Sequence, residues 1–236
     1  MILEHHYAVR QVLDEGRCAD IIEEGLSNLQ PAAVGGGNLN RRNSEVAWLP
    51  NSELFTHISP YIAECNRTTG WQFDIDHSEG IQFTKYGVGQ YYDWHPDGGS
   101  DWHSIYQPAM RDKYGVWKRC RVTFNDGGYQ NIIITDEDAP VREIYEAKQL
   151  QMPFTGEKDW WGKVRKLSLT INLSNPRSYE GGDFEIQRDD DIEVVTEGRG
   201  QGNMILFPSF LPHRVTPVTR GTRYSLVIWL LGRPFR

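Results

Sequence analysis

The order of hydrophobic patterns predicts a mainly β protein in which N-terminal helices back an antiparallel sandwich or jelly roll. Helical spacing of apolar residues is confined to the first third of the chain, and alternation with a period of two begins near residue 81. Helices followed by a series of short strands are typical of folds whose helices cover a sheet. The length of 236 residues is ordinary for one such domain and sufficient to bury a core.

Two helices are expected in the N-terminal third. The first is DEGRCADIIEEGLSNL, whose apolar residues recur at helical spacing at Cys18, Ile21, Ile22 and Leu26. The second is PNSELFTHISPYIAEC, whose apolar side consists of Leu54, Ile58 and Ile62. Asn51 or Ser52 can cap this second helix. Pro60 is expected to break or restart it, because proline lacks the N–H that a helix interior requires.

Strands are expected from residue 81 onward. In IQFTKY, Ile81 and Phe83 alternate with polar neighbours. The clearest strand is VRKLSLTINLSNP, with one apolar face formed by Leu167, Leu169, Ile171 and Leu173 and one polar face formed by Ser168, Thr170 and Asn172. Further strand-like runs are DFEIQ, EVVT, NMILFP and TRYSLVIWLL, separated by Gly, Asp and Pro. Residues 98–163 show no sustained period and are rich in Trp and Tyr.

Charge and cysteine content restrict the class of protein. The formal net charge is −7 and the isoelectric point is near 5.5, which disfavours a general nucleic-acid binder. The three cysteines lie far apart and form no C-x-x-C pair, which fits a reducing compartment better than a disulfide framework or a zinc ribbon. The N-terminus lacks a signal-peptide pattern, and no apolar stretch approaches membrane-spanning length. We therefore expect a soluble cytoplasmic protein without a membrane partner.

The stretch QYYDWHPDGGSDWH contains a candidate pair of metal ligands. His95 and Asp97 are two residues apart, so on an extended chain their side chains project from the same face. His213, which follows a proline-flanked turn, is the best candidate for a third ligand. Two histidines and one carboxylate that leave open positions form the facial triad of non-haem Fe(II) oxygenases. Taken alone, an H-x-D pair is common, and a lone histidine is more often structural.

A candidate carboxylate-binding pair, Arg223 and Ser225, which we call the clamp, supports this interpretation. Arg223 and Ser225 share one face of a predicted strand, and a guanidinium beside a hydroxyl suits a small carboxylate. Arg223 alone would be read as part of a surface salt bridge. Combined with the three candidate ligands, it completes what a 2-oxoglutarate-dependent enzyme requires.

Three motifs resemble a known family. YGVGQYYDWHPD matches the pattern Y-x-x-G-x-x-Y-x-x-H-x-D of the prolyl 4-hydroxylase-like branch of Fe(II)/2-oxoglutarate dioxygenases, at Tyr86, Gly89, Tyr92, His95 and Asp97. RKLSLTINLSNPRSYEGGDFEI resembles the R-x-x-S/T strand and the Tyr-Glu-Gly-Gly-acid turn of that branch. The closing segment FPSFLPHRVTPVTRGTRYSLVIW resembles bacterial PKHD-type hydroxylases. The resemblance covers roughly residues 80–97 and 164–231.

The resemblance implies a double-stranded β-helix (jelly-roll, cupin-like) core and a role for each motif residue. It implies that Fe(II) is bound by His95, Asp97 and His213. It also implies that Arg223 pairs with the distal carboxylate of 2-oxoglutarate, with Ser225 beside it. Tyr86 matches a tyrosine that hydrogen-bonds the cosubstrate, although a half-buried strand tyrosine is an equally good reading. Ascorbate is the expected reductant.

We expect one domain over residues 1–236. Its parts are a helical support at 1–79, a jelly-roll core at 80–97 and 164–236, and an insertion at 98–163 that is long compared with the relatives and could form a lid or substrate element. Other candidates near the site are His103 as a competing ligand or substrate contact, Asp93 as a solvated acid or an orienting partner, Ser168 as a pocket or structural hydroxyl, and Trp229 as a core or pocket residue.

The expected function is hydroxylation of an unidentified substrate, with release of succinate and carbon dioxide. A prolyl residue is the substrate that the resemblance favours, and a protein, a peptide or a small molecule would be the partner. The alternatives are a cupin-like metal-binding or sensing protein without turnover, and a zinc hydrolase with the same three ligands. An AlkB-like nucleic-acid oxygenase is disfavoured by the acidic charge.

Overall fold

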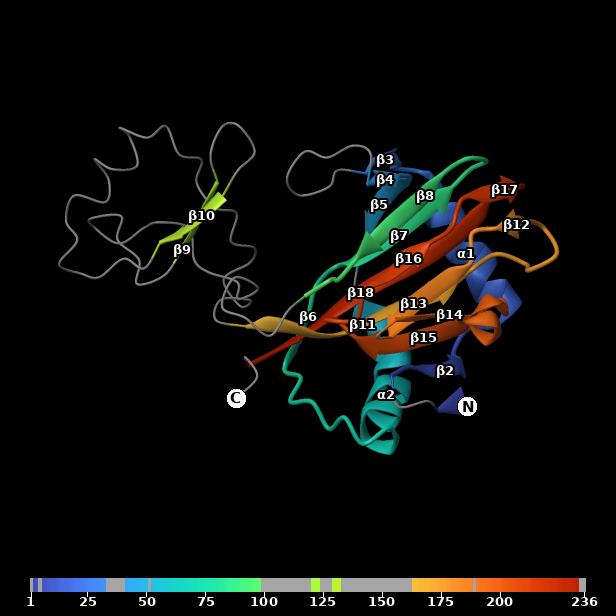
Figure 1. Ribbon diagram of the computed structural model, residues 1–236. Helices are drawn as coiled ribbons and strands as arrows, with labels where there is room; N and C mark the ends of the chain where they lie inside the picture. The colour runs from blue at the N-terminus through green and yellow to red at the C-terminus, as the bar shows by residue number, and fades with distance from the viewer. Residues whose placement is uncertain are drawn as a thin grey trace. The chain divides into compact units, whose positions relative to one another are not determined.

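The computed structural model describes residues 2–3, 6–32, 41–50, 52–98, 120–123, 129–132, 163–188 and 190–233. The chain divides into two compact units. The first consists of residues 1–98 and 165–231, and the second of residues 99–164 and 232–236. Figure 1 shows the elements of the first unit as a layered body of strands with two helices.

Helix α1 spans Glu15–Leu26, as the apolar spacing predicts. It begins after Asp14, whose side chain accepts a hydrogen bond from the backbone N–H of Arg17 at 2.7 Å and so satisfies a free donor of the first turn. The expected inward position of Leu26 is wrong, since 42% of this residue is exposed. Gly25 faces the sheet instead, because a side chain there would collide with the ring of Phe83.

Helix α2 spans Ser52–Thr68 and buries Leu54, Ile58 and Ile62 as predicted. The expected break at Pro60 is wrong, because the helix continues through this residue. Proline cannot donate to the carbonyl of Thr56 four residues earlier. The hydroxyl of Ser59 donates to that carbonyl at 3.2 Å, which replaces the missing hydrogen bond.

The larger sheet has nine strands, and those with a defined register pair antiparallel. Its order is β1 (Ile2–Leu3), β2 (Ala8–Gln11), β15 (Asn203–Pro208), β11 (Val164–Asn172), β18 (Arg223–Gly232), β7 (Ile81–Tyr86), β5 (Glu45–Leu49) and β3 (Gln30–Pro31), with β6 (His77–Ser78) also paired to β18. The N-terminal third was expected to be helical, and the strands β2 and β5 correct this expectation. Both are short and obtain their hydrogen bonds from strands far away in the sequence.

The smaller sheet has five strands and carries much of the site. Its order is β14 (Asp191–Val194), β13 (Phe184–Arg188), β16 (His213–Val215), β8 (Tyr91–His95) and β4 (Arg42–Asn43). A short ladder of β12 (Glu180–Gly181) and β17 (Val218–Arg220) and a 3-10 turn at Thr196–Arg199 complete this region. The predicted runs DFEIQ, NMILFP and TRYSLVIWLL thus correspond to β13, β15 and β18. The run EVVT overlaps β14 only at Glu193 and Val194, and its last residue, Thr196, begins the 3-10 turn.

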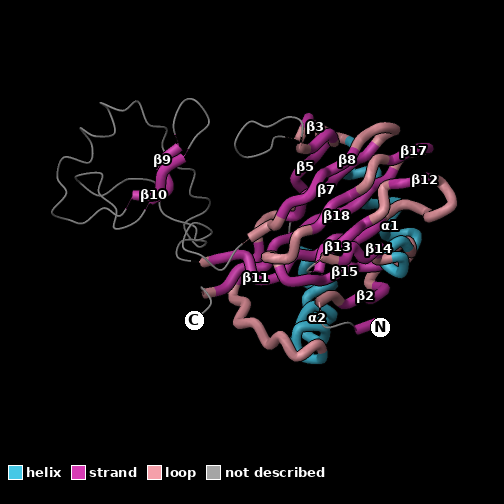
Figure 2. Tube along the Cα trace, in the orientation of Figure 1, coloured by secondary structure: helices cyan, strands magenta, loops and turns pink. Residues whose placement is uncertain are grey.

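Two hydrophobic clusters stabilise the layers. The first packs α1 and α2 against one face of the larger sheet and includes Ile21, Ile58, Leu167 and Ile171. The second lies between the two sheets and includes Tyr86, Phe184, Ile205, Phe207 and Val215. Figure 2 shows the two helices in cyan beside the magenta strands. The predicted class, a jelly-roll core backed by N-terminal helices, is confirmed.

The second unit is described only in part. Its β9 (Cys120–Thr123) and β10 (Tyr129–Ile132) form an antiparallel pair in which Thr123 lies opposite Tyr129. His103 lies outside the described residues. No helix within the described ranges is both long enough and apolar enough to cross a membrane.

Candidate metal centre and cosubstrate pocket

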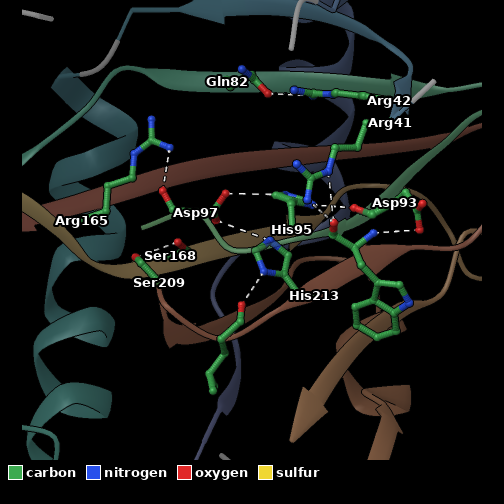
Figure 3. A network of polar contacts seen from close by, with 12 residues as sticks. Arg41, Arg42, Gln82, Asp93, His95, Asp97, Arg165, Ser168, Ser209 and His213 are labelled. Carbon is green, nitrogen blue, oxygen red and sulfur yellow. Dashed lines mark hydrogen bonds and ion pairs between the residues drawn. The ribbon is translucent and has the colours of Figure 1, made fainter. Parts of the chain in front are cut away.

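The three candidate ligands come from two neighbouring strands of the smaller sheet. β8 ends at His95, Asp97 follows two residues later, and His213 begins β16. His95 and His213 are direct Cα partners across the β8–β16 ladder. The potential ligand atoms of the three side chains all lie within 4.8 Å of one another. Figure 3 shows both imidazoles turned toward the carboxylate of Asp97.

Hydrogen bonds fix the orientation and the tautomer of both imidazoles. The Nδ1 atom of His95 lies 2.7 Å from the carbonyl of Asp93, and that of His213 lies 2.9 Å from the carbonyl of Leu211. A carbonyl can only accept, so each Nδ1 carries the hydrogen and each Nε2 keeps a lone pair. The Nε2 atoms lie 3.6 Å and 3.5 Å from the two carboxylate oxygens of Asp97. The donor set therefore suits a metal dication.

Asp93 acts through its backbone. Its carboxylate is exposed and accepts a hydrogen bond from the N–H of Trp94 at 2.8 Å. The carbonyl of the same residue accepts from His95. The main chain of Asp93, rather than its side chain, therefore orients His95. The side chain of Asp93 is a solvated acid, as one of the two interpretations predicted.

Burial and nearby charges favour a neutral imidazole at His95 and an ionised carboxylate at Asp97. Burial, together with the nearby His213, lowers the pKa of His95 to about 4. Burial alone would raise the pKa of Asp97, but the charges of His213, His95 and Arg165 and a hydrogen bond from Ser168 outweigh it and lower the pKa. Both shifts favour the protonation states that bind a metal ion.

The ion pair between Arg165 and Glu79 and backbone hydrogen bonds to Ser209 hold Asp97 in place. The guanidinium of Arg165 pairs with both carboxylate oxygens of Glu79 at 2.5 and 2.7 Å and donates to the carbonyl of Asp97 at 3.2 Å. The N–H groups of Asp97 and Gly98 both donate to the carbonyl of Ser209 at 2.9 Å. A Cβ on Gly98 would come within 3.1 Å of the backbone of Arg165, so a larger residue would push the two segments apart.

The candidate clamp faces the same pocket. Arg223 is 3% exposed and is the Cα partner of Tyr86 across the β18–β7 ladder. Its guanidinium donates to the hydroxyl of Ser225 at 3.3 Å and lies 5.7 Å from the centre of the Tyr86 ring. No carboxylate among the described residues pairs with it. Gly182, with φ of +61°, leaves the space that the Arg223 side chain fills.

One pocket joins these groups. It measures about 430 Å³, including space open to solvent. It is lined by all three candidate ligands, by Tyr86, Arg223 and Ser225, and by Arg42, Gln82, Thr170 and Trp229 among others. Trp229 is 7% exposed, so it is both a core residue and a wall of the pocket. The hydroxyl of Ser168 lies 2.9 Å from that of Ser209 behind Asp97.

Sequence reasoning missed several residues of the site. Glu79 and Arg42 precede the recognised motifs and carry no local signal of function. Arg165 belongs to the R-x-x-S/T strand, so that motif could have directed attention to it. Tyr92 is a motif residue whose contact was not foreseen: its ring stacks on His95 with centroids 3.5 Å apart.

Comparison with known proteins agrees with the motifs. Residues 152–231 match the family model of the 2OG-Fe(II) oxygenase superfamily. A PKHD-type hydroxylase of Teredinibacter turnerae is 44% identical over 64 residues, which is 27% of either chain. One from Hyphomonas neptunium is 45% identical over 64 residues, 27% of this chain and 28% of that protein. The matches to these oxygenases thus span little more than a quarter of their length.

Solved structures extend the likeness in fold over nearly the whole chain. A Pseudomonas putida prolyl-4-hydroxylase has a TM-score of 0.57 at 16% identity and covers 97% of this chain and 94% of its own. The viral collagen prolyl hydroxylase of Paramecium Bursaria Chlorella virus-1, described as a 2OG complex, has a TM-score of 0.53 at 18% identity and covers 96% of each chain. The predicted resemblance to prolyl 4-hydroxylases is thus confirmed at the level of the fold.

Proposed function

We propose that this protein is a Fe(II)- and 2-oxoglutarate-dependent dioxygenase that hydroxylates an organic substrate and releases succinate and carbon dioxide. The observation that supports this most strongly is a single pocket that holds two imidazoles, a carboxylate and a buried arginine without a carboxylate partner among the described residues. A cupin-like metal-binding protein or a zinc hydrolase needs the first three groups but has no use for Arg223.

In this proposal, His95, Asp97 and His213 hold the iron. Both Nε2 atoms present lone pairs because both Nδ1 atoms donate to carbonyls. Arg165 and the carbonyl of Ser209 keep Asp97 from turning away. When bound, iron and 2-oxoglutarate supply the activation of dioxygen, and the protein supplies binding geometry and exclusion of water. Ascorbate is the reductant that we propose for maintaining Fe(II).

Arg223 is proposed to bind the distal carboxylate of 2-oxoglutarate, with Ser225 and Tyr86 beside it. The guanidinium is fully charged, buried, and held by Ser225 at 3.3 Å, so it offers an oriented fork to a carboxylate. Thr170 and Ser168, on the pocket side of β11, add polar groups near the metal site.

The substrate class is proposed by analogy. The P. putida and viral neighbours are prolyl hydroxylases, and a Trichoplax adhaerens neighbour is a prolyl hydroxylase in complex with a hypoxia inducible factor peptide. We propose a prolyl residue of a protein or peptide, or a small molecule of similar shape. We further propose that residues 1–236 form one domain, that residues 98–163 contribute to substrate selection, and that the protein is cytoplasmic, which agrees with free, buried Cys18 and Cys65.

Succinate formation tests the proposal. The purified protein is supplied with Fe(II), 2-oxoglutarate, ascorbate and oxygen, and succinate is measured for wild type, His213→Ala and His57→Gln. His57 is the matched control because its ring bonds the carbonyl of Val12 at 2.8 Å, away from the pocket residues. We expect succinate from wild type and His57→Gln and none from His213→Ala. Failure of the wild type to bind Fe(II) and 2-oxoglutarate would support the cupin-like or zinc alternatives instead.

The clamp is tested by the affinity for 2-oxoglutarate. Arg223→Ala removes charge-assisted hydrogen bonds worth about 1.5–3 kcal/mol each, so the apparent affinity should fall at least about tenfold. Arg220→Ala is the control, since Arg220 forms an exposed ion pair with Glu180 at 2.8 Å. An unchanged affinity in Arg223→Ala would assign the cosubstrate carboxylate to another cation of the pocket.

A further inference from the structure

A second buried arginine lines the pocket and is given no role in the proposed function. Arg42, on β4, is 8% exposed and belongs to the same pocket as the three candidate ligands and Arg223. It lies in the smaller sheet, whereas Arg223 lies in the larger one. Figure 3 shows its side chain bonded to Gln82.

All described polar partners of Arg42 are neutral. Its Nε donates to the hydroxyl of Ser44 at 2.8 Å, and one terminal nitrogen donates to the side-chain carbonyl of Gln82 at 2.9 Å and approaches the hydroxyl of Thr84 at 3.5 Å. Among the residues that the structure describes, no carboxylate pairs with it. The preceding segment 33–40, AVGGGNLN, contains no acidic residue.

The guanidinium is close to the metal site. It lies 4.6 Å from the centre of the Tyr92 ring, and that ring stacks on His95 at 3.5 Å with an interplanar angle of 16°. One aromatic ring therefore separates the cation from a proposed metal ligand. An anionic group that is bound by Arg42 would lie in the same pocket as the candidate metal ligands.

When iron and 2-oxoglutarate are bound as proposed, the positive charges near the site exceed the negative charges by one, and Arg42 carries the unbalanced charge. Under the proposed function, the metal dication is offset by the cosubstrate dianion, and Asp97 is offset by Arg223. Arg165 is already paired with Glu79. A buried charge without a counter-ion is costly, and a carboxylate that accepts a hydrogen bond from the arginine relieves that cost. No carboxylate of the described residues is left to pair with Arg42, so we look to the substrate as the source of one.

We propose that Arg42 binds a carboxylate of the substrate, so that the enzyme acts on carboxylate-bearing molecules rather than on neutral peptide segments. This inference rests on the proposed function and narrows its substrate class. The carboxylate can be the free acid of a small molecule or chain end, or the side chain of an acidic residue next to the hydroxylated one. Ser44 and Gln82 hold the guanidinium in place and leave its second terminal nitrogen for the ligand.

The test uses protein loaded with Mn(II) and 2-oxoglutarate, which does not turn over. Probe binding is followed by the broadening that Mn(II) causes in the proton NMR lines of the probe. One arm compares N-acetyl-L-proline with N-acetyl-L-prolinamide, and the other compares the amidated dipeptides acetyl-Asp-Pro and acetyl-Asn-Pro. We expect at least one acid to bind about tenfold more tightly than its amide, the preference that one charge-assisted bond supplies. The arm that shows it identifies the source of the carboxylate.

Variants assign the preference to Arg42. Arg42→Gln should abolish the difference between acid and amide while 2-oxoglutarate still binds, and Arg42→Lys, which keeps a cation, should retain part of it. Arg177→Gln, at an exposed arginine in the connection after β11, should behave as wild type. Equal binding of acids and amides by wild type overturns the inference, as does loss of 2-oxoglutarate in Arg42→Gln. Failure of wild type to bind 2-oxoglutarate contradicts the proposed function itself, and this inference with it.

Discussion

The two faces of β11 are equally buried and chemically opposite. On the side of the helices, Leu167 and Ile171 are 0% exposed and pack in the aliphatic cluster with α1 and α2. On the side of the smaller sheet, Ser168, Thr170 and Asn172 are 0%, 6% and 2% exposed. Burial alone therefore does not distinguish a core face from a site face in this protein.

The hydrogen bonds of the polar face explain why it is tolerated. Ser168 bonds Ser209 at 2.9 Å, and the amide of Asn172 donates to the carbonyls of Ser174 and Arg199 at 2.9 and 2.7 Å. Buried polar groups that are satisfied in this way cost little, whereas unsatisfied ones are destabilising. The helix-side face contributes stability, and the pocket-side face contributes position and polarity.

The largest expected effect is a loss of stability caused by a substitution on the helix-side face of β11. Ile171→Ala leaves a cavity in the aliphatic cluster and should lower the free energy of unfolding by about 2–5 kcal/mol. Thr170→Val, one residue away on the pocket side, should change it by less than about 1 kcal/mol, because Thr170 faces the pocket rather than the packed cluster. Urea unfolding measures both values. Equal losses for the two variants would mean that the two faces are not energetically distinct.

An intermediate effect concerns the pH dependence of the metal-free protein. The pKa of His95 is lowered from 6.5 to about 4, so between these values the unfolded chain binds a proton that the folded protein does not. The free energy of unfolding should therefore fall as the pH is lowered through this window, by about 3 kcal/mol if His95 acts alone. Urea unfolding at several pH values in this window measures the slope. His95→Asn should flatten it, and an unchanged slope would exclude His95 as its source.

The smallest expected effect concerns the support of Asp97. Arg165→Ala removes the hydrogen bond to the carbonyl of Asp97 and the ion pair with the buried Glu79. Affinity for Fe(II) should fall about tenfold, the lower end of what loss of a residue supporting a metal ligand costs. Lys85→Ala is the control, because Lys85 pairs with Glu45 at 2.7 Å at a half-buried position outside the pocket. Equal iron affinity in wild type and Arg165→Ala would show that Ser209 alone holds the Asp97 backbone.

The sequence alone determined the parts of this protein that depend on local spacing. The period of two in VRKLSLTINL predicts both faces of β11, and the period of helical residues predicts α1 and α2. The motif around His95 and Asp97, with His213 and Arg223 downstream, predicted the resemblance to the 2OG-Fe(II) oxygenases and the candidate ligands. These features can be predicted from the sequence for one of two reasons. The residues that define each helix or strand lie close together in the chain, and the site residues belong to motifs that occur in a fixed order.

Tertiary structure decided what depends on partners far away in the sequence. β2 and β5 exist because β15 and β7 supply their hydrogen bonds. Gly25 rather than Leu26 faces the sheet because the ring of Phe83 fills the space. Arg42 could not be recognised in the sequence for the same reason, because no neighbouring residue marks it as functional. Its charge is buried beside the candidate metal site only because β4 lies against Gln82 and Tyr92 in the fold. A side chain acquires such a role from what the fold brings against it, which local pattern does not encode.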